Sequence, residues 1–332
     1  MSESFKALLA TDNEEGKSVS AFTELTVDDL PPGDTVVRVA YSTLNYKDGL
    51  AINGNRGKVM RSSPMIPGID LCGMIESSDN PNYNVGDRVI ITGWGMSETE
   101  WGGYTQMARV NSDWLVPLPD GMNLHQAMAI GTAGFTSMLA VMGLEHMGIK
   151  PDSGDILVTG AAGGVGSIAI ALLAKLGYNV VASTGRAETH EYLTSLGAAS
   201  FIGREELEGD GKPLDRALWA GAVDTVGSKI LANVIPKISQ NGAVSVCGNA
   251  AGFDLPTTVL PLILRGVSLL GINSVFVDTE KRIAAWQRLV QDLDMAKLDE
   301  MTEIVPFDDL LPLSKDILNG QVRGRTVIDV NV

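Results

Sequence analysis

The chain has 332 residues, of which 45% are hydrophobic and 20% charged, and this composition indicates a compact protein of two domains and excludes a mainly disordered chain. Its 40 acidic residues outnumber its 25 lysines and arginines and give a net charge of −15, so no general attraction to nucleic acid or to anionic membranes is expected. With two cysteines, no signal-peptide pattern and no window that approaches the roughly 20 apolar residues of a membrane span, the sequence favours a cytoplasmic protein.

The first 120 or so residues contain short β-rich runs that glycine and proline interrupt, such as residues 35–41, 87–92 and 104–110. This pattern predicts an irregular, mostly β domain. Residues 124–142 are rich in Ala, Met, Leu and Gly without strand alternation, which predicts a helix that opens a second domain. The side chain of Asn123 is the expected N-terminal cap of that helix.

From residue 155 onward, apolar β runs alternate with helical segments, which indicates βαβ units and a parallel sheet. The predicted strands are residues 156–159, 179–183, 200–202, 222–224, 243–247 and 268–272. The predicted helices between them are residues 167–176, 188–195, 229–238 and 259–264. Six strands in this order fit a doubly wound dinucleotide-binding sheet.

The end of the chain departs from this alternation. A polar helix is predicted near residues 280–293 and a final strand at residues 326–330. We expect this segment to return to the first domain. The predicted organisation is therefore an α/β chain with a mostly β domain from residues 1–123 and 276–332 and a dinucleotide-binding domain from residues 124–275.

The strongest chemical signal is the glycine-rich segment TGAAGGVG at residues 159–166, between the first predicted strand of the sheet and the helix that follows. Glycines let the backbone approach a pyrophosphate closely, and the N–H groups at the start of the helix can bind it. The alternative is a tight connection that binds no ligand, but the strand before and the helix after are the context that a dinucleotide site requires. The predicted pyrophosphate contacts are Ala162, Gly163, Gly164 and Val165.

The end of the second predicted strand indicates NADPH rather than NADH. An NAD site usually has Asp or Glu about 20 residues beyond the glycines, whereas this chain has Thr184, Gly185 and Arg186 there. A hydroxyl and a guanidinium suit a 2′-phosphate. Arg204, just after the third strand, either contacts the adenine or the same phosphate or is an ordinary surface charge. Two further predicted cofactor contacts, just past the fifth strand, are Gly248 and Asn249.

Motifs along nearly the whole chain resemble those of the medium-chain dehydrogenases/reductases, in the zinc-independent quinone oxidoreductase branch. They include the segments NYKD at 45–48, PGID at 67–70, WGGY at 101–104, GTAGFT at 131–136 and GRT at 324–326. Three of them, NYKD, WGG and the TGR at 184–186, look most like the acrylyl-CoA reductase group of that branch. The resemblance implies a GroES-like first domain, completed by the C-terminal segment, with a Rossmann domain inserted.

The resemblance also implies a reaction, the NADPH-dependent reduction of acrylyl-CoA to propionyl-CoA by hydride transfer to the β-carbon. No metal is implied, because GID at 68–70 stands where zinc-dependent relatives have Gly-His-Glu. Tyr46 is expected beside the nicotinamide, either as a hydrogen-bond donor and proton source or only as a cofactor contact. A backbone N–H or a cofactor ribose hydroxyl could supply the same hydrogen bond. Asp48 is either a proton carrier or a carboxylate that stabilises a turn.

Further contacts follow from the same resemblance. Ile272 and Arg325 are expected to contact the cofactor, and Asn45 the substrate. A loop rich in Gly and Asn carries three basic residues that either bind the phosphates of coenzyme A or are ordinary solvated charges, namely Arg56, Lys58 and Arg61. Relatives commonly form homodimers, so a homodimer is expected. Two alternatives remain open, a general quinone or enone reductase of the same fold and a non-catalytic NADPH-binding sensor or structural protein.

Overall fold

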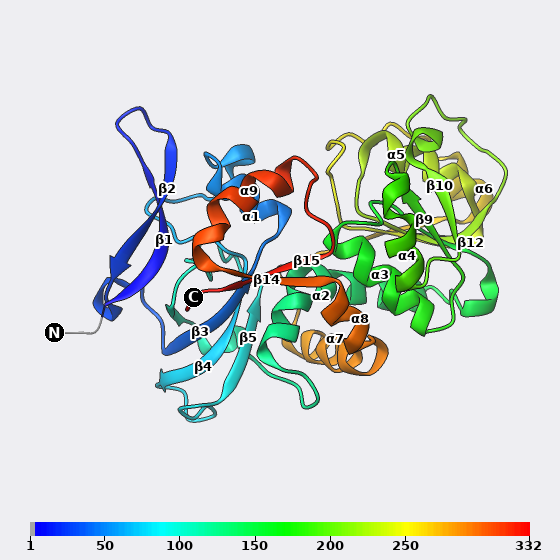
Figure 1. The fold of residues 1–332 in the computed structure, drawn as a ribbon. Helices are drawn as coiled ribbons and strands as arrows, with labels where there is room; N and C mark the ends of the chain where they lie inside the picture. The colour runs from blue at the N-terminus through cyan, green and yellow to red at the C-terminus, as the bar shows by residue number, and fades with distance from the viewer. Residues whose placement is uncertain (1–3) are drawn as a thin grey trace. The chain divides into compact units, whose positions relative to one another are not determined.

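The computed structural model describes residues 4–332, which form two compact units. Unit 1 comprises the residues up to Thr132 together with Val275–Val290 and Leu298–Val332. Unit 2 comprises Ala133–Ser274 and Gln291–Lys297. Each unit is built on its own sheet (Figure 1).

Unit 1 contains a seven-stranded sheet, in which six strands follow the order β14-β15-β3-β4-β5-β7 and the seventh, β6, pairs with β3. It also contains a hairpin formed by β1 and β2. This confirms the mostly β first domain. The last strand of the chain pairs with β3 through Val327 and Thr43, so its predicted return is also confirmed. The strands are β1 (Phe5–Asp12), β2 (Ser18–Leu25), β3 (Thr35–Thr43), β4 (Asp70–Ser78), β5 (Arg88–Thr92), β6 (Met107–Val110), β7 (Val116–Pro117), β14 (Thr302–Pro306) and β15 (Arg325–Asp329).

Unit 1 also contains helices, and the first of them, α1, carries candidate site residues in its first turn. Gly49 allows α1 to approach α9 closely, since a Cβ there would lie 2.8 Å from Cγ2 of Ile317. The helices are α1 (Tyr46–Ile52), α7 (Thr279–Asp292), α8 (Met295–Glu300) and α9 (Leu310–Leu318). The core beneath them contains side chains that are almost fully buried, such as Val37, Leu71 and Phe307.

Unit 2 is a parallel sheet of order β10-β9-β8-β11-β12-β13, and this order reverses direction beside β8 as in a doubly wound nucleotide-binding fold. All six predicted strands are confirmed, although β11 and β12 begin earlier than predicted. The strands are β8 (Ile156–Val158), β9 (Val180–Thr184), β10 (Ser200–Gly203), β11 (Trp219–Asp224), β12 (Ile238–Val246) and β13 (Ser268–Gly271). The helices between them are α3 (Gly164–Lys175), α4 (His190–Leu196), α5 (Ser228–Val234) and α6 (Leu260–Arg265).

The helix predicted at residues 229–238 is shorter than expected. It ends as α5 at Val234, and Ile235–Lys237 form a single 3-10 turn before Ile238 begins β12. Pro236 explains the difference, because proline lacks the N–H that would continue the helical hydrogen bonds. The β-branched Ile238 then pairs with Trp219 of the neighbouring strand β11.

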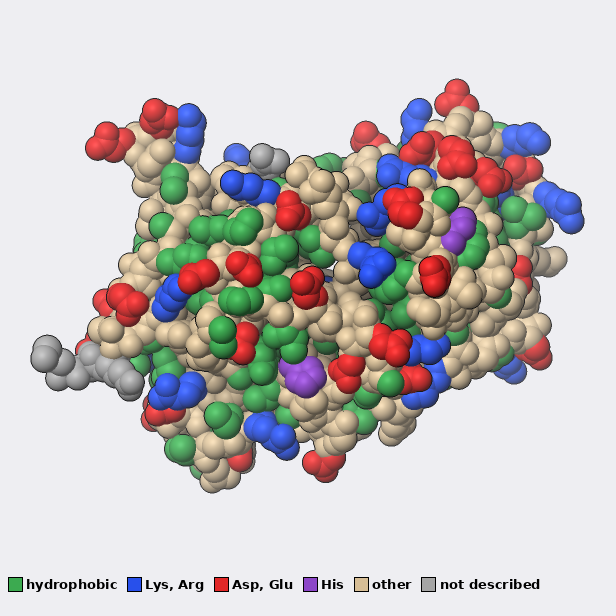
Figure 2. Space-filling view, in the orientation of Figure 1, with side chains coloured by type: hydrophobic (Ala, Val, Ile, Leu, Met, Phe, Trp, Pro, Cys, Tyr) green, Lys and Arg blue, Asp and Glu red, His purple; other side chains and the backbone are tan. Residues whose placement is uncertain are grey.

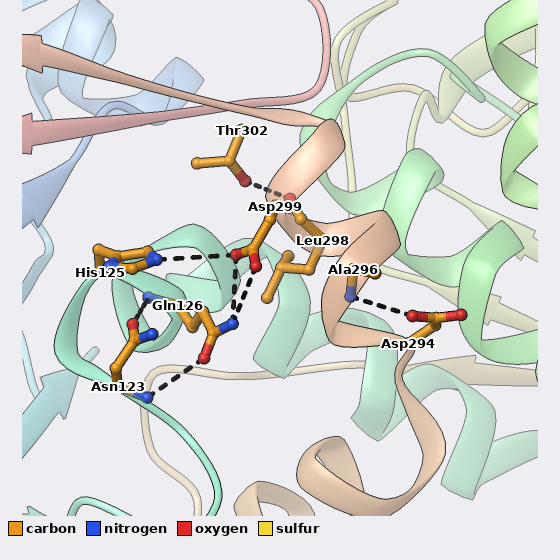
Figure 3. A network of polar contacts seen from close by, with 8 residues as sticks. All are labelled: Asn123, His125, Gln126, Asp294, Ala296, Leu298, Asp299 and Thr302. Carbon is orange, nitrogen blue, oxygen red and sulfur yellow. Dashed lines mark hydrogen bonds and ion pairs between the residues drawn. The ribbon is translucent and has the colours of Figure 1, made fainter.

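Helix α2 (Leu124–His146) joins the two units and is longer than predicted. Asn123 caps it as expected, since its Oδ1 accepts a hydrogen bond of 2.9 Å from the N–H of Gln126 (Figure 3). The expectation that no window could span a membrane is wrong for α2 by length and composition, because its mean hydropathy reaches 1.6 over 18 residues. However, 83% of that window is buried, so α2 is a core helix.

The path of α2 bends where the two units meet in sequence. Gly131 has φ 47° and ψ −157°, which no right-handed helix contains and which favours glycine. The first turn of α2 is held on the unit 1 side, where Nε2 of Gln126 donates to both carboxylate oxygens of Asp299 in α8, at 3.2 and 3.1 Å. Figure 3 shows the His125 ring directed at the same carboxylate, 3.7 Å away.

Candidate functional site

The glycine-rich turn lies between β8 and α3, at the position that the sequence predicts. Gly160 adopts φ +59°, and its carbonyl accepts a hydrogen bond of 3.0 Å from the N–H of Gly163. Gly166 must lack a side chain, since a Cβ there would lie 2.4 Å from the Gly160 oxygen. The glycines therefore allow α3 to pack directly against the turn.

The N-terminus of α3 has the geometry of an anion site. Gly163 is its N-cap, with extended φ −80° and ψ 172°, and no side chain in the described part of the chain caps it. The first N–H groups of a helix have no partner within the helix. Those of Gly164 and Val165 therefore provide a positive cradle that suits a pyrophosphate.

The end of β9 is stabilised by hydroxyl groups. Oγ1 of Thr184 accepts a hydrogen bond of 3.1 Å from the N–H of Arg186 and lies 3.1 Å from Oγ1 of Thr189. The Thr189 hydroxyl also donates to the Arg186 carbonyl, at 2.7 Å. These contacts hold the backbone of Arg186 at the carboxyl end of β9, which is where the adenosine ribose lies in this class of sheet.

Arg204 lies beside this turn. Strands β9 and β10 pair Thr184 with Gly203, so Arg204 leaves the sheet at the same edge. A Cβ on Gly185 would lie 3.4 Å from the Cβ of Arg204, which shows how closely the two turns approach. Nε of Arg204 forms a half-exposed ion pair of 2.7 Å with Glu208. The carboxyl ends of β9 and β10 thus fit a dinucleotide with a 2′-phosphate, although the Arg204 guanidinium already pairs with the Glu208 carboxylate.

The remaining cofactor residues predicted in unit 2 lie on the same edge of the sheet. Gly248 follows β12 and passes so close to the loop after β11 that a Cβ would lie 1.8 Å from the Thr225 oxygen. Asn249 is exposed next to it. Ile272 follows β13 and donates its N–H to the Val246 carbonyl at 2.9 Å. Their roles as cofactor contacts stay predictions.

In unit 1, the NYKD segment forms the start of α1. Asn45 is the N-cap and Asp48 completes a capping box, because Oδ2 of Asp48 accepts a hydrogen bond of 2.9 Å from the N–H of Asn45. Oδ1 of Asp48 accepts another, of 3.0 Å, from the N–H of Ile69. Asp48 therefore has the turn-stabilising role considered above. This arrangement leaves Tyr46 at the first position of α1, with 45% of the residue exposed.

A second buried carboxyl group, Asp70, adjoins Asp48 through a shared amide. Nδ2 of Asn45 donates to Oδ2 of Asp48 at 3.0 Å and to Oδ2 of Asp70 at 2.9 Å. Asp70 also accepts hydrogen bonds from the N–H and the hydroxyl of Thr132. Burial, and secondly the charge of Asp70, raises the pKa of Asp48 to about 7. Burial likewise raises the pKa of Asp70, against the lowering effect of its hydrogen bonds.

Arg325 completes this network from the last strand. Its guanidinium donates to the Ala129 carbonyl at 2.6 Å, to Oγ1 of Thr43 at 2.7 Å and to Oδ1 of Asn45 at 3.4 Å. Only 3% of the residue is exposed. In unit 1 its guanidinium therefore orients Asn45, while the predicted cofactor contact stays a prediction.

Sequence reasoning missed the role of Asp70 and Thr132. In the sequence, Asp70 is only a departure from the Gly-His-Glu pattern, and Thr132 is only part of a motif. The signal that indicates a structural role is an aspartate among apolar residues at the start of a strand, since a buried carboxyl group needs partners. Within residues 4–332 no group of three or more His, Cys, Asp or Glu side chains could hold a metal ion.

The predicted basic loop lies in unit 1 around the turn η2 (Arg56–Lys58). Lys58 is exposed, and Nη2 of Arg61 lies 3.8 Å from a carboxylate oxygen of Glu98. The side chain of Arg56 lies outside the described residues. Figure 2 shows acidic and basic side chains interspersed over the visible face of this acidic protein.

Comparison with known proteins identifies both units. Residues 31–120 match the alcohol dehydrogenase GroES-like domain, and residues 164–291 match the zinc-binding dehydrogenase family. Acrylyl-CoA reductase AcuI of Ruegeria pomeroyi is 52% identical over 98% of this chain and 99% of its own length.

Two solved structures resemble the whole chain. E. coli K-12 YhdH with bound NADPH superposes with a TM-score of 0.95 at 49% identity, covering 98% of this chain and 100% of that one. Bacillus subtilis yhfP with NAD bound has a TM-score of 0.95 at 43% identity, covering 99% of this chain and 100% of that one.

Proposed function

The chain belongs to the medium-chain dehydrogenase/reductase family, and from this premise we propose that it is an NADPH-dependent reductase of acrylyl-CoA. The observation that carries the proposal is the 52% identity with an acrylyl-CoA reductase, which extends over 98% of the chain and thus over both units. The product is propionyl-CoA, because only the carbon–carbon double bond is reduced.

The cofactor site in unit 2 supports this proposal. The helix N-terminus at Gly163 suits the pyrophosphate, and Arg186 at the end of β9 suits a 2′-phosphate. When bound, NADPH supplies the hydride that reduces the β-carbon. The protein contributes orientation and binds the developing negative charge.

The residues of unit 1 would stabilise the negative charge that develops on the thioester oxygen. The hydroxyl of Tyr46, a residue that is 45% exposed, is the proposed hydrogen-bond donor to that oxygen. Asn45, the proposed substrate contact, is oriented by Asp48, Asp70 and Arg325. Asp48 is fully buried behind Asn45, so it acts as a positioning residue that retains a proton on its carboxyl group up to about neutral pH.

One assay tests this function. NADPH oxidation is followed with acrylyl-CoA, crotonyl-CoA and a quinone under identical conditions, and kcat/KM for acrylyl-CoA should exceed that for the quinone by at least about tenfold. A preference for the quinone would favour a general quinone reductase. Tight NADPH binding without oxidation by any activated alkene would favour a non-catalytic binder.

We also propose that the protein is a cytoplasmic homodimer. Strand β13 is an edge of the six-stranded sheet, and large apolar side chains are exposed on the preceding helix α6 and on its N-cap residue, Val259. Val259, Ile263 and Leu264 are 61%, 69% and 61% exposed. An exposed apolar surface beside an unpaired strand edge is typical of an interface. Both cysteines, Cys72 and Cys247, are free thiols, which supports a reducing compartment.

A further inference from the structure

Three charged side chains meet beside α1 in unit 1. Glu98 lies between the two cations with only 18% of its side chain exposed. Its Oε1 accepts a hydrogen bond from Nζ of Lys47, and its Oε2 lies 3.8 Å from Nη2 of Arg61. Lys47 directly follows Tyr46 in α1, so this cluster adjoins the proposed oxyanion donor along the chain.

The loop that carries Arg61 has a fixed shape. The side-chain amide of Asn55 spans it, donating to the Met60 carbonyl at 2.7 Å and accepting from the Met60 N–H at 2.8 Å. The N–H of Arg61 then donates to the Glu98 carbonyl at 2.8 Å. These contacts hold the loop against the segment that carries Glu98.

The loop also stores backbone strain. Asn55 and Lys58 have φ of 49° and 53°, and Gly57 between them has φ 72°. Left-handed conformations are unfavourable for residues with a side chain and persist where the surrounding contacts hold them, often at binding sites. Lys58 is exposed and lies on the same loop as Arg61.

The charges of this region favour an anionic ligand of high charge density. Lys47, Lys58 and Arg61 carry three positive charges, whereas Glu98 and Glu100 carry two negative charges on the loop that faces Arg61, and only Glu98 pairs with Lys47 and Arg61. The cations therefore outnumber the carboxylates here, although the net charge of the whole protein is −15. A phosphate, with up to two charges and several acceptor oxygens, binds such a group more strongly than a carboxylate does.

We propose that Lys47, Lys58 and Arg61 form the subsite for the phosphorylated tail of the acyl-CoA substrate, and that Glu98 is the counter-ion that a substrate phosphate displaces. Without substrate, Glu98 holds the Lys47 ammonium in place and limits repulsion between the cations. With substrate, the phosphate takes over Lys47 and Arg61. The inference rests on the proposed function, because it assumes a coenzyme A thioester as the substrate.

The test compares KM for acrylyl-CoA with KM for but-3-en-2-one, a small uncharged enone, at saturating NADPH. Lys47→Met should raise KM for acrylyl-CoA about fivefold to tenfold, because a direct phosphate partner is lost. Glu98→Gln should lower it about twofold to fivefold, because the competing carboxylate is gone. KM for the enone should change less than about twofold in both variants, since it carries no charge.

Glu100→Gln is the matched control, because it removes the same charge from the same loop two residues away from Glu98. It should leave KM for acrylyl-CoA within about twofold of the wild-type value. Added salt should raise KM for acrylyl-CoA in the wild type more than in the Lys47→Met variant.

Two outcomes would overturn the inference. Equal shifts in KM for both substrates would show that the cluster only maintains the fold around α1. A rise in KM for acrylyl-CoA in Glu98→Gln would show that Glu98 is required in the bound state. If the wild-type protein reduces the enone but not acrylyl-CoA, the proposed function itself fails, which is a distinguishable result.

Discussion

Asp48 combines complete burial with three hydrogen-bond donors that face its carboxyl group, the backbone N–H groups of Asn45 and Ile69 and the side-chain amide of Asn45. Its pKa of about 7 lies above the ordinary value of 3.8, so the folded protein favours the protonated form. Between these two values the folded state keeps a proton that the unfolded state releases. The contribution of Asp48 to stability is therefore complete at low pH, decreases as the pH rises through this window and is lost above about 7.

Asp48→Asn should remove this dependence. When the buffer changes from about pH 5 to about pH 8, the Tm of the wild type should fall relative to the Tm of the variant, because Asp48 ionises in this range and Asn cannot. Thermal denaturation across this range measures it. The exposed Asp120→Asn is the control and should give a curve parallel to that of the wild type. A parallel curve for Asp48→Asn as well would contradict the assigned protonation.

Tyr46 has two possible roles that its motif alone does not distinguish, a hydrogen-bond donor to the thioester oxygen and a contact to the cofactor. If its hydroxyl donates to the thioester oxygen, Tyr46→Phe should lower kcat about tenfold to hundredfold with NADPH affinity unchanged. Steady-state kinetics and a fluorescence titration of NADPH measure the two quantities. Weaker NADPH binding at unchanged kcat would instead assign Tyr46 as a cofactor contact, and no change in either would exclude both roles.

At the scale of elements, the turn between β8 and α3 requires glycine at two positions for different reasons. A Cβ at Gly166 would lie 2.4 Å from the Gly160 oxygen, so Gly166→Ala should destabilise the fold by about 1–3 kcal/mol and lower Tm. A Cβ at Gly163 would lie 3.3 Å from that oxygen at an allowed φ of −80°.

Gly163→Ala should therefore keep Tm close to that of the wild type and weaken NADPH binding about tenfold, because a methyl group would enter the proposed pyrophosphate site. The two variants serve as controls for each other in calorimetry and in NADPH titration. Wild-type NADPH affinity in Gly163→Ala would refute the assignment of this turn.

The end of β9 should decide between cofactors. Arg186→Ala should lower kcat/KM with NADPH about thirtyfold to hundredfold, because a charge-assisted contact to the 2′-phosphate is lost, and should leave NADH almost unaffected. Arg204→Ala is the comparison variant, and its effect should be smaller because Arg204 follows β10, one strand further from the expected position of the adenosine ribose. Equal losses with both cofactors would contradict a 2′-phosphate site at Arg186.

Local patterns predicted the elements of unit 2 well, because its strands are short apolar runs bounded by glycine or helix caps, as at Ile156 and Gly177. They failed where one residue changed the backbone, at Pro236 and at the bend of Gly131. The NYKD and glycine-rich motifs predicted two separate sets of candidate residues, one in each unit.

The buried network around Asp70 could not be predicted in the same way. Its partners come from three separate parts of the chain, and Asn45 and Arg325 lie 280 positions apart. No periodicity of 2 or 3.6 residues reports such pairings, which arise only when strands far apart in sequence become neighbours. The Lys47 pairing with Glu98 was missed for the same reason.

For the whole molecule, the apolar surface of α6 predicts an assembly. The molar mass of the wild-type protein from sedimentation should be twice the 35.1 kDa of one chain. Ile263→Glu should lower this mass toward that of one chain, because a charge would be buried in an apolar contact. Analytical ultracentrifugation at several concentrations measures this. An exposed substitution elsewhere, such as Val85→Glu, should leave the mass unchanged, and a monomeric wild type would refute the homodimer.

The position of β15 bears on how the chain folds during synthesis. This strand lies between β14 and β3, and its Thr326 is bonded to Thr43, 283 positions earlier (Figure 1). Most of unit 2 is one continuous stretch, Ala133–Ser274, which is fully translated before β15 exists. The sheet of unit 2 can thus form on the ribosome, whereas that of unit 1 waits for the last strand. The early strands of unit 1 would then be among the last to complete their fold, which exposes them to chaperones while unit 2 is translated.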